Sequence, residues 1–543
     1  MKRSIKVLSV VLILSIVGTG YYFFQDTRDP YIKDVDHSVP EEMIPQFREI
    51  SFDFFHNFDP KQSLPLVGSC LIDIDDDGTD EVFIGGGHNQ KDVLYQYKNG
   101  DFEDISDIVN LPEKFGAVTH GAVSFDLDED GYTDLLLARD DGVWLMKNND
   151  GKFTPNQIQV PLNDSSIPVS FSLGDVNRDG FTDIFVCNYV PLTEKKKQRV
   201  FNDENYGASS LLLLNNGNNT FRNVTKNYGL DYTHNTYQAV MVDLDDDHWL
   251  DLVVAYDTGE TRTYRNLEGQ QFIPMANPLT GRFAFPMGIG VGDFNNDEKI
   301  DLFFTNSGSS VPKSIAKGDL EDEQQLVLQW LLFRNEGGFQ FTDISEEAKV
   351  ADFEFAWGCV LEDFNLDGRQ DLAVAENSIK FPPHRAFKLP CRFLLQKEDG
   401  TFAAVEQQAG LVNRNYALTP LTSDFNDDGY PDLVYVNLNG PVRAFLNEGG
   451  DHNYLKVKLV ESGGNAGTKA TLQMKDGKKL SDVYIIGEGL SADQTNTMTF
   501  GLGKATDVSS LVITYPSGQR DTLMEPEINE TYVFPSSEFS ILN

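Results

Sequence analysis

Cysteine, tryptophan and basic residues are scarce in this chain of 543 residues. It contains four cysteines and four tryptophans, and 44 Lys and Arg residues stand against 84 Asp and Glu residues, for a formal net charge of −40. A chain this acidic lacks the basic stripes that displace counterions from nucleic acids, so we expect no nucleic-acid partner. Phe (38) and Tyr (20) are plentiful and 40% of the residues are hydrophobic, so the chain can bury large β-rich cores.

The four cysteines, Cys70, Cys187, Cys359 and Cys391, do not form a disulfide framework. Cys70 and Cys359 precede Asp-rich segments and Cys187 follows one, so these three fall in different repeats. We predict small buried thiols. A bridge between Cys359 and Cys391 remains open at this point.

Catalytic motifs are missing as well. The eight histidines are scattered without the spacing of zinc ligands, and no nucleophile motif stands out. Among 84 carboxylates, a pair at glycosidase spacing arises by chance, so none can be singled out. The sequence therefore predicts no catalytic residue and favours a protein that is not an enzyme.

What the chain does have is a recurring Asp-rich phrase. Residues 126–134 (Asp-Leu-Asp-Glu-Asp-Gly-Tyr-Thr-Asp) place oxygen side chains at positions one, three, five and nine, and Gly at position six. Calcium takes six to eight oxygen ligands, and Gly allows the sharp turn that brings in the carbonyl of position seven. An EF-hand would carry Glu at position twelve, but Leu137 stands there within an apolar run. The phrase thus predicts a calcium loop between two strands.

Seven such loops, which we call Asp loops one to seven, begin at Asp73, Asp126, Asp175, Asp243, Asp293, Asp363 and Asp424. Their spacings are 53, 49, 68, 50, 70 and 61 residues, which is the mark of a repeat protein. We predict up to seven Ca²⁺ ions held by positions one, three, five, seven (through its carbonyl) and nine, which are Asp73, Asp75, Asp77, Thr79 and Glu81; Asp126, Asp128, Asp130, Tyr132 and Asp134; Asp175, Asn177, Asp179, Phe181 and Asp183; Asp243, Asp245, Asp247, Trp249 and Asp251; Asp293, Asn295, Asp297, Lys299 and Asp301; Asp363, Asn365, Asp367, Arg369 and Asp371; and Asp424, Asn426, Asp428, Tyr430 and Asp432.

Three of these loops depart from the pattern. Loop one offers Asp80 beside Glu81, and either carboxylate can close the site. Loops four and five replace the Gly of position six with His248 and Glu298, so we expect weaker calcium binding there, because a Cβ disfavours positive φ. All seven loops can also be structural clips without a regulatory role.

Each repeat unit reads as four short strands. The fold predicted from these units is all-β, a seven-bladed β-propeller over residues 46–450. The last unit lacks its fourth strand, and residues 47–51 (Phe-Arg-Glu-Ile-Ser) match the missing phrase. We expect residues 46–52 to close the last blade, which hides the exposed sheet edges of an open array.

Insertions lengthen three units between their second and third strands, at residues 189–209, 307–328 and 378–390. Residues 315–328 are expected to be helical. The insertions should crowd the face opposite the Asp loops, where they either carry function or reflect neutral variation in loop length.

The two ends of the chain differ from the repeats. Residues 1–24 join a basic start to an apolar run and predict a signal peptide or an uncleaved signal anchor, followed by a polar tether over 25–45. The body is therefore expected outside the cytoplasm, either secreted or anchored to the membrane. Residues 452–537 lack Asp loops and alternate like strands, so we expect a small separate β-domain.

These motifs resemble known families. Residues 174–183 (Gly-Asp-Val-Asn-Arg-Asp-Gly-Phe-Thr-Asp) are similar to FG-GAP/VCBS repeats, the propeller units also seen in integrin α chains. The tail resembles the ASPIC/UnbV domain through residues 465–467, 500–503 and 515–518, although Tyr515 stands where that family usually has Trp and Lys469 interrupts its Gly-Ala-Arg phrase. The combination resembles the cartilage acidic protein-like family.

The resemblance implies an exported, calcium-binding adhesion or interaction protein, and it supplies no catalytic motif. We therefore expect a non-enzymatic module that binds a protein or glycan at the cell surface. The alternative is an extracellular polysaccharide-processing enzyme, such as a lyase, built on a propeller scaffold.

Overall fold

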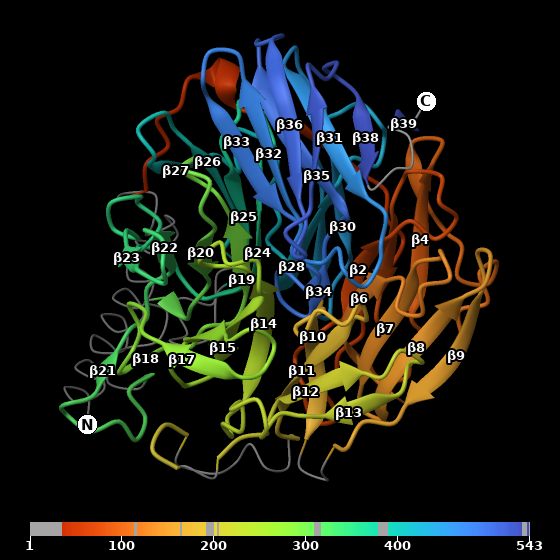
Figure 1. Cartoon of the computed structure of the whole chain (residues 1–543), viewed down its shortest axis with the longest axis vertical. Coiled ribbons are helices and arrows are strands. Elements are labelled where there is room, and N and C mark those ends of the chain that lie inside the picture. The colour runs from red at the N-terminus through yellow and green to blue at the C-terminus, as the bar shows by residue number, and fades with distance from the viewer. Residues whose placement is uncertain are drawn as a thin grey trace, which may run out of the picture.

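The computed structural model describes residues 35–112, 117–162, 166–191, 200–203, 206–308, 316–377, 389–534 and 540–541. The predicted signal segment 1–24 and residues 25–34 of the tether lie outside these residues. The described chain is built from strands, with one short 3₁₀ turn, η1 (Glu41–Met43). In this part of the chain no helix has the length and apolar character needed to span a membrane. The all-β propeller predicted from the repeats is confirmed (Figure 1).

The repeat region forms seven sheets in chain order. From the innermost strand outward they contain β2 (Ser69–Ile72), β3 (Glu81–Ile84), β4 (Val93–Lys98) and β5 (Asp101–Asp104); β6 (Thr119–Phe125), β7 (Asp134–Arg139), β8 (Gly142–Asn148) and β9 (Phe153–Ile158); β10 (Ile167–Gly174), β11 (Asp183–Tyr189), β12 (Leu211–Asn215) and β13 (Phe221–Asn223); β14 (Thr236–Val242), β15 (Asp251–Tyr256), β16 (Arg262–Asn266) and β17 (Phe272–Met275); β19 (Ile289–Gly292), β20 (Asp301–Phe304), β22 (Leu331–Asn335) and β23 (Phe341–Asp343); β24 (Ala356–Glu362), β25 (Asp371–Glu376), β26 (Arg392–Gln396) and β27 (Phe402–Ala404); and β28 (Ala417–Ser423), β29 (Asp432–Asn437), β30 (Arg443–Asn447) and β1 (Phe47–Ile50).

The innermost strands line a closed ring. Each contacts the innermost strand of the next sheet, and β28 of the last sheet lies against β2 of the first. They are almost entirely buried, because they meet neighbouring sheets on both faces, whereas an outer strand such as β9 is buried only at its ends. The approach is close: a Cβ on Gly121 would lie 2.3 Å from the carbonyl oxygen of Val169 in the next sheet, so this position requires glycine.

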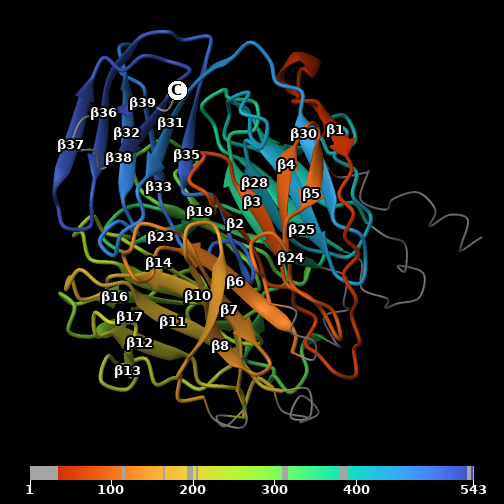
Figure 2. The same ribbon diagram turned by 90° about the vertical axis from the view of Figure 1, so that its right-hand side faces the viewer.

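The last sheet takes its outer strand from the start of the repeat region. Strand β1 pairs antiparallel with β30, with Phe47 opposite Asn447 and Ile50 opposite Ala444 (Figure 2). The Phe47 ring packs edge-on against Phe364 and Phe393 of the sixth unit, at centroid distances of 6.1 and 5.8 Å. Residues from both ends of the repeat region therefore share one sheet and one core.

Replacing Phe47 with alanine tests how much this closure contributes. Phe47 is 8% exposed, so we expect Phe47→Ala to lower the free energy of unfolding by roughly 3–5 kcal/mol through the cavity it leaves. Phe55→Ala is the matched control, since that ring is 53% exposed. Denaturant titration of both variants measures the difference, and equal midpoints would contradict a closing role for β1.

All four cysteines are free and buried, as predicted from their spacing, and Cys359 is not bridged to Cys391. Burial raises the pKa of the Cys187 thiol to about 12. Such thiols behave as small apolar side chains.

In the described part of the second insertion, Ala316 is helical, but residues 317–328, which were also expected to be helical, are not. Gly318 adopts a φ of +54° within the turn at residues 317–319, and β21 (Gln325–Leu326) pairs in parallel with β18 (Arg282–Phe283). The apolar residues that suggested a helix pack instead with Phe201 of the first insertion. Residues 378–388 of the third insertion and the Lys195–Lys197 run lie outside the described residues.

The C-terminal domain (described residues 452–534 and 540–541) packs directly on the propeller. It contains two sheets, one of β35 (Thr497–Gly503), β31 (Asn453–Leu459), β38 (Thr531–Phe534) and β39 (Ser540–Ile541), the other of β33 (Lys479–Val483), β32 (Lys469–Met474), β36 (Val508–Thr514) and β37 (Arg520–Met524). Its core is continuous with that of the second and third repeat sheets. The reason lies in the stretch between β33 and β35.

Residues 486–494, which we call the axial segment, enter the ring. Their short strand β34 (Ala492–Asp493) pairs in parallel with β2, and Figure 1 shows it among β2, β6, β10 and β28. Innermost strands of six sheets hydrogen-bond to the segment, namely Ser69 N to Ser491 O (3.3 Å), Ala122 N to Ser491 O (3.4 Å), Leu173 N to Ile486 O (3.3 Å), Gln238 Nε2 to Gly487 O (2.5 Å), Ile289 N to Gly489 O (3.0 Å) and Thr422 N to Gln494 Oε1 (3.0 Å). Gly489 also lies beside the carbonyl oxygen of Cys359 on β24.

Gln238 holds the axial segment at two points, because its amide also accepts a hydrogen bond from Ser491 N at 2.9 Å. We expect Gln238→Ala to destabilise the protein by about 1–3 kcal/mol, since the partner groups become buried without hydrogen bonds. Gln157→Ala, which removes an exposed amide, is the control. Limited proteolysis near residue 451 reports the effect: the C-terminal domain should be released faster from the Gln238 variant, and equal rates would contradict the anchoring role.

Candidate calcium sites

Every Asp loop joins the innermost strand of a sheet to its second strand, and the loops share one backbone frame. The position-one carboxylate accepts the N–H of position six in all seven loops, for example Gly131 N to Asp126 Oδ2 at 2.8 Å. The position-five carboxylate accepts the N–H of position seven, as from Tyr132 to Asp130 at 3.2 Å. These bonds curl each loop around its own centre.

Carboxylates converge in three loops. Oxygen atoms of positions one, three and nine lie within 4.8 Å of one another in loop one (Asp73, Asp75, Glu81), loop two (Asp126, Asp128, Asp134) and loop four (Asp243, Asp245, Asp251). Loops three, five, six and seven carry Asn at position three, so a neutral amide oxygen replaces one carboxylate. In loop three, Asn177 Oδ1 accepts from Asp179 N at 2.9 Å and its Nδ2 donates to Asp179 Oδ2.

In loop one, the structure shows which of two neighbouring carboxylates, Asp80 or Glu81, occupies position nine. Glu81 points inward and accepts from Ile74 N at 3.1 Å, the bond that Asp183 makes with Val176 N in loop three. Asp80 turns toward the neighbouring sheet and accepts from Ser423 Oγ at 2.6 Å. Glu81 therefore fills position nine.

Loops four and five keep the frame without glycine. His248 and Glu298 adopt φ values of +71° and +69°, and their N–H groups still donate to Asp243 and Asp293 at 2.7 and 2.8 Å. Side chains at such φ values cost about 1–2 kcal/mol. Weaker calcium binding at these two loops stays a prediction.

Position nine is the most deeply buried carboxylate of each loop. Burial, reinforced by the other loop carboxylates, raises the pKa of Asp134 and Asp183 to about 8 and that of Glu81, Asp251 and Asp301 to about 9. The backbone N–H of Asn148 donates to Asp134 and that of Asn215 donates to Asp183. These hydrogen bonds favour the charged carboxylate, but they offset only part of the rise in pKa. A nearby cation would favour the charged form.

The residues present fit a hard cation. Several buried loop oxygens have no hydrogen-bond donor among the described residues: Asp128 Oδ1, Asp134 Oδ2, Asp245 Oδ1 and Asp301 Oδ2. Uncompensated carboxylate oxygens at this depth are unfavourable unless they are protonated or bind a cation. Carboxylate and carbonyl oxygens are the donors that Ca²⁺ prefers. Several loops are thus positioned to hold a metal ion, and calcium is the ion that their donors fit.

An Asn at the end of the third strand is a structural partner that the sequence analysis did not identify. Asn148 Nδ2 donates to Ile74 O in the preceding Asp loop at 3.0 Å and to Thr133 O in its own loop at 3.1 Å. Asn266, Asn335, Gln396 and Asn447 make the same link between adjacent loops. Asn stands at this place in five units (Asn148, Asn215, Asn266, Asn335 and Asn447), whereas the first has Tyr97 and the sixth has Gln396, and this partial recurrence was the available signal.

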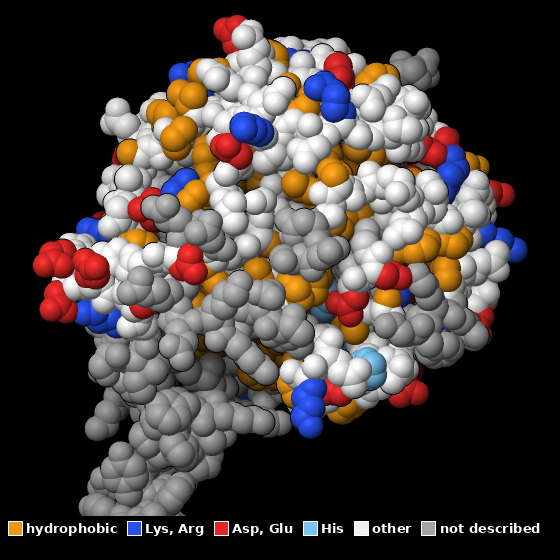
Figure 3. Space-filling model, turned by 90° about the horizontal axis from the view of Figure 1, so that it is seen from below, with side chains coloured by type: hydrophobic (Ala, Val, Ile, Leu, Met, Phe, Trp, Pro, Cys, Tyr) orange, Lys and Arg blue, Asp and Glu red, His pale blue; other side chains and the backbone are white. Residues whose placement is uncertain are grey.

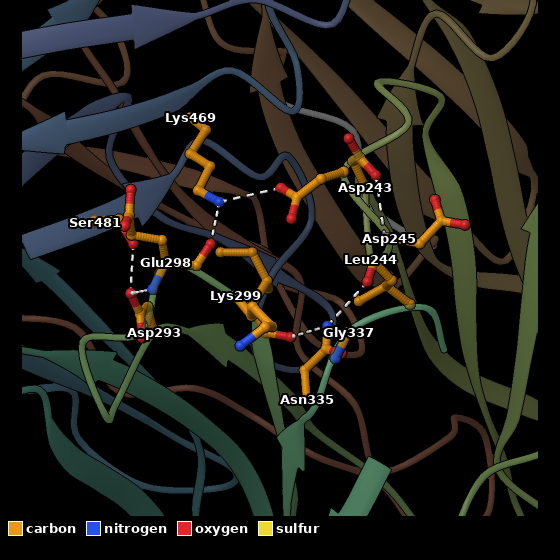
Figure 4. Close-up of polar contacts among 12 residues, drawn as sticks. Asp243, Leu244, Asp245, Asp293, Glu298, Lys299, Asn335, Gly337, Lys469 and Ser481 are labelled. Atoms are coloured by element: carbon orange, nitrogen blue, oxygen red, sulfur yellow. Dashed lines mark hydrogen bonds and ion pairs between the residues drawn. The ribbon is translucent and has the colours of Figure 1, made fainter. Parts of the chain in front are cut away.

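The C-terminal domain contacts all seven Asp loops. The contacts are Lys458 with Asp73, Glu461 with Asp126 N (2.8 Å), Gly463 with Gly180, Lys469 with Asp246 (3.3 Å), Ser481 with Asp293 (2.5 Å), Gly503 N with Leu366 O (2.7 Å) and Lys456 with Asp424. Figure 4 shows Lys469 and Ser481 reaching loops four and five. Within the propeller, Lys147 and Arg265 reach loops two and four. Basic side chains therefore lie beside loops one, two, four and seven, and they come from different structural elements.

The raised pKa values set a pH test. Without calcium, these carboxylates are protonated in the folded protein but ionised when unfolded, so their stabilising contribution is present below about pH 4 and lost as pH rises to about 8–9. Calcium needs the ionised form, so we expect the gap in melting temperature between calcium and EDTA to be wider at about pH 8.5 than at about pH 6. Asp134→Asn removes one titrating ligand and should narrow the gap. A gap that does not change with pH would contradict occupied sites.

Known protein families match the chain in two regions. The FG-GAP-like repeat matches residues 73–136, 126–186 and 243–304, each starting at the first Asp of a loop, and ASPIC and UnbV matches residues 463–540. The chain therefore carries FG-GAP-like repeats followed by an ASPIC/UnbV domain, as the motifs suggested.

Among individual proteins, cartilage acidic protein 1 of Xenopus tropicalis is 23% identical over 345 residues, which are 59% of this chain and 50% of that protein. The Mus musculus protein of the same name is 22% identical over 260 residues, 44% of this chain and 39% of that protein. This homology is weak, and the chain spans half the length of these relatives or less.

Solved structures show a distant likeness. Rhamnogalacturonan lyase YesW has a TM-score of 0.41 at 12% identity and covers 74% of this chain and 75% of its own. The BBS1N chain in its complex with ARL6DN has a TM-score of 0.43 at 10% identity, over 71% of this chain and 93% of that one. The V. cholerae biofilm matrix protein Bap1 has a TM-score of 0.30 at 10% identity, over 91% of this chain and 63% of its own.

Proposed function

We propose that this chain is an exported, calcium-binding propeller that acts as a non-enzymatic interaction module for a protein or glycan at the cell surface. The insertion face, formed by the loops between second and third strands, would bind the partner. The observation that carries this proposal is that the opposite face is already occupied, because the C-terminal domain contacts every Asp loop.

The insertions support the proposal because they form one layer. Phe201 of the first insertion packs on Phe283 and Phe285 at centroid distances of 5.8 and 5.6 Å, and also on Leu320 and Leu326 of the second. Three neighbouring units therefore contribute to a single small core. An assembled layer on a rigid ring is suited to presenting a binding surface.

Asp319 of the second insertion links it to the first insertion through hydrogen bonds. Its carboxylate accepts the N–H groups of Val200, Phe201 and Asn202, each at 3.1 Å. Figure 3 views the molecule from the side away from the C-terminal domain and shows acidic side chains gathered at one edge of this face. The partner class remains protein or glycan.

A non-enzymatic role agrees with the state of the buried charges. Arg392 pairs with Glu376 and Glu406 at 2.5 and 2.8 Å, and Arg139 pairs with Asp92 at 2.5 Å. These charged groups are therefore engaged with one another inside the sheets. The calcium-stabilised fold, the predicted export segment and the ASPIC/UnbV domain fit an extracytoplasmic binding protein, either secreted or held by its N-terminal segment.

The test is a pull-down with residues 25–543 against surface extracts and a glycan panel, in calcium and in chelator. We expect a partner retained in calcium whose retention falls about tenfold in Asp319→Ala, because that variant loses three charge-assisted hydrogen bonds that order the insertion layer. Asp322→Ala is the matched control, since that exposed carboxylate pairs only locally with Lys317. Equal loss in both variants, or binding indifferent to both, would contradict the assigned face. Shortening of a panel glycan would instead support the polysaccharide-processing alternative.

A further inference from the structure

A cleft of about 570 Å³ opens where the C-terminal domain meets Asp loops four and five. One wall is the outer face of the sheet β33-β32-β36-β37, and the other is formed by the two loops. Figure 4 shows the boundary, with Lys469 projecting from β32 toward Glu298 and the Asp243 loop. Its size falls within the range of small-ligand pockets, about 300–1,000 Å³.

The two loops at this cleft are those that carry a side chain at position six. Loops one, two, three, six and seven have Gly there, with φ between +81° and +94°. His248 and Glu298 hold similar backbone conformations despite a Cβ, and both line the cleft. The equivalent Gly residues of the other five loops adopt this φ without strain. A strained side chain kept only where a cleft opens indicates that the side chain serves the cleft.

The sheet wall presents hydroxyl and amide groups in cross-strand rows. Lys469 lies opposite Thr514, Thr471 opposite Val512, and Gln473 opposite Ser510. The hydroxyls of Thr471, Ser510 and Thr514 line the cleft half-buried, and none has a hydrogen-bond partner among the described residues. They remain available to a ligand, and the hydroxyl of either Thr or Ser can donate or accept.

The charges of the cleft are largely matched to one another. Lys479 pairs with Glu298 at 2.7 Å, Lys469 with Asp246 at 3.3 Å, and Lys299 with Asp297 at 2.9 Å. Arg520 also lines the cleft and has no ion pair among the described residues, but a ligand with several charges would still have to displace one of the paired groups. A neutral ligand rich in hydroxyl groups would leave the pairs intact and use the free hydroxyls.

We propose that this cleft binds a short, neutral oligosaccharide. The cleft lies on the face of a sheet, so its wall offers side-chain groups instead of the backbone edge that an extended peptide would pair with. The Asp243 carboxylate of loop four also lines it, so calcium at loop four would order one wall. The site is distinct from the insertion face, so each proposal can fail while the other holds.

The experiment titrates residues 25–543, in calcium, with a panel of neutral, uronic-acid and sulfated oligosaccharides by calorimetry. We expect a neutral member to bind, and Thr471→Val and Ser510→Ala each to weaken it about three- to tenfold, the loss of one hydrogen bond. Thr531→Val is the matched control, because it removes a hydroxyl from a different cavity near loops one and seven. The Asp319 variant should bind the sugar normally.

His248→Gly separates a binding role from a structural one. Glycine suits the φ of +71°, so the variant should melt at the same temperature or higher, yet bind the oligosaccharide several-fold more weakly. The proposal is overturned if no neutral oligosaccharide binds, if the charged members bind best, or if Thr471→Val and Thr531→Val behave alike.

Discussion

The axial segment is the contact on which the rest of the molecule depends. In a ring of sheets, the innermost strands have backbone N–H and C=O groups that point toward the central axis and cannot all pair within their own sheets. Here residues 486–494 provide hydrogen-bond partners for these groups. The segment belongs to the C-terminal domain, so filling the axis also fixes that domain on the Asp-loop side. The two regions are thus joined by backbone hydrogen bonds deep inside the ring.

This arrangement changes how the acidic charge of the chain is balanced. Seven Asp loops on one side of the ring concentrate carboxylates that repel one another. Calcium can neutralise the loop centres, and Lys456 and Lys458, both largely buried on β31, meet Asp424 and Asp73 at their outer edges. Both kinds of cation act on the same carboxylates, so calcium binding and docking of the C-terminal domain are energetically linked.

Much of the propeller fold could be predicted from local patterns in the sequence. The Asp loops, the alternating strands and the phrase at 47–51 depend on spacing within one unit, which periodicity reports directly. The axial segment gave no such signal, because its hydrogen bonds join residues some 70 to 420 positions apart and its sequence is unremarkable. The choice of Glu81 over Asp80 likewise depended on Ser423, which is distant in sequence but adjacent across the closed ring. The helix prediction was wrong for residues 317–328, whose apolar side chains pack with Phe201 of another insertion.

Occupation of the axis and of the Asp-loop side narrows where a partner can bind. A ligand along the channel would have to displace Gly487 and Gly489, whose positive φ and close packing against Phe171 and Cys359 leave no spare room. What remains are the insertion face and the margins where the C-terminal domain stands away from the ring. One such margin is the cleft over loops four and five, where the repeats depart from glycine. The positions that depart from the repeat pattern are therefore the more informative ones for locating a binding site. The repeated residues maintain the ring, whereas His248 and Glu298 line a cleft.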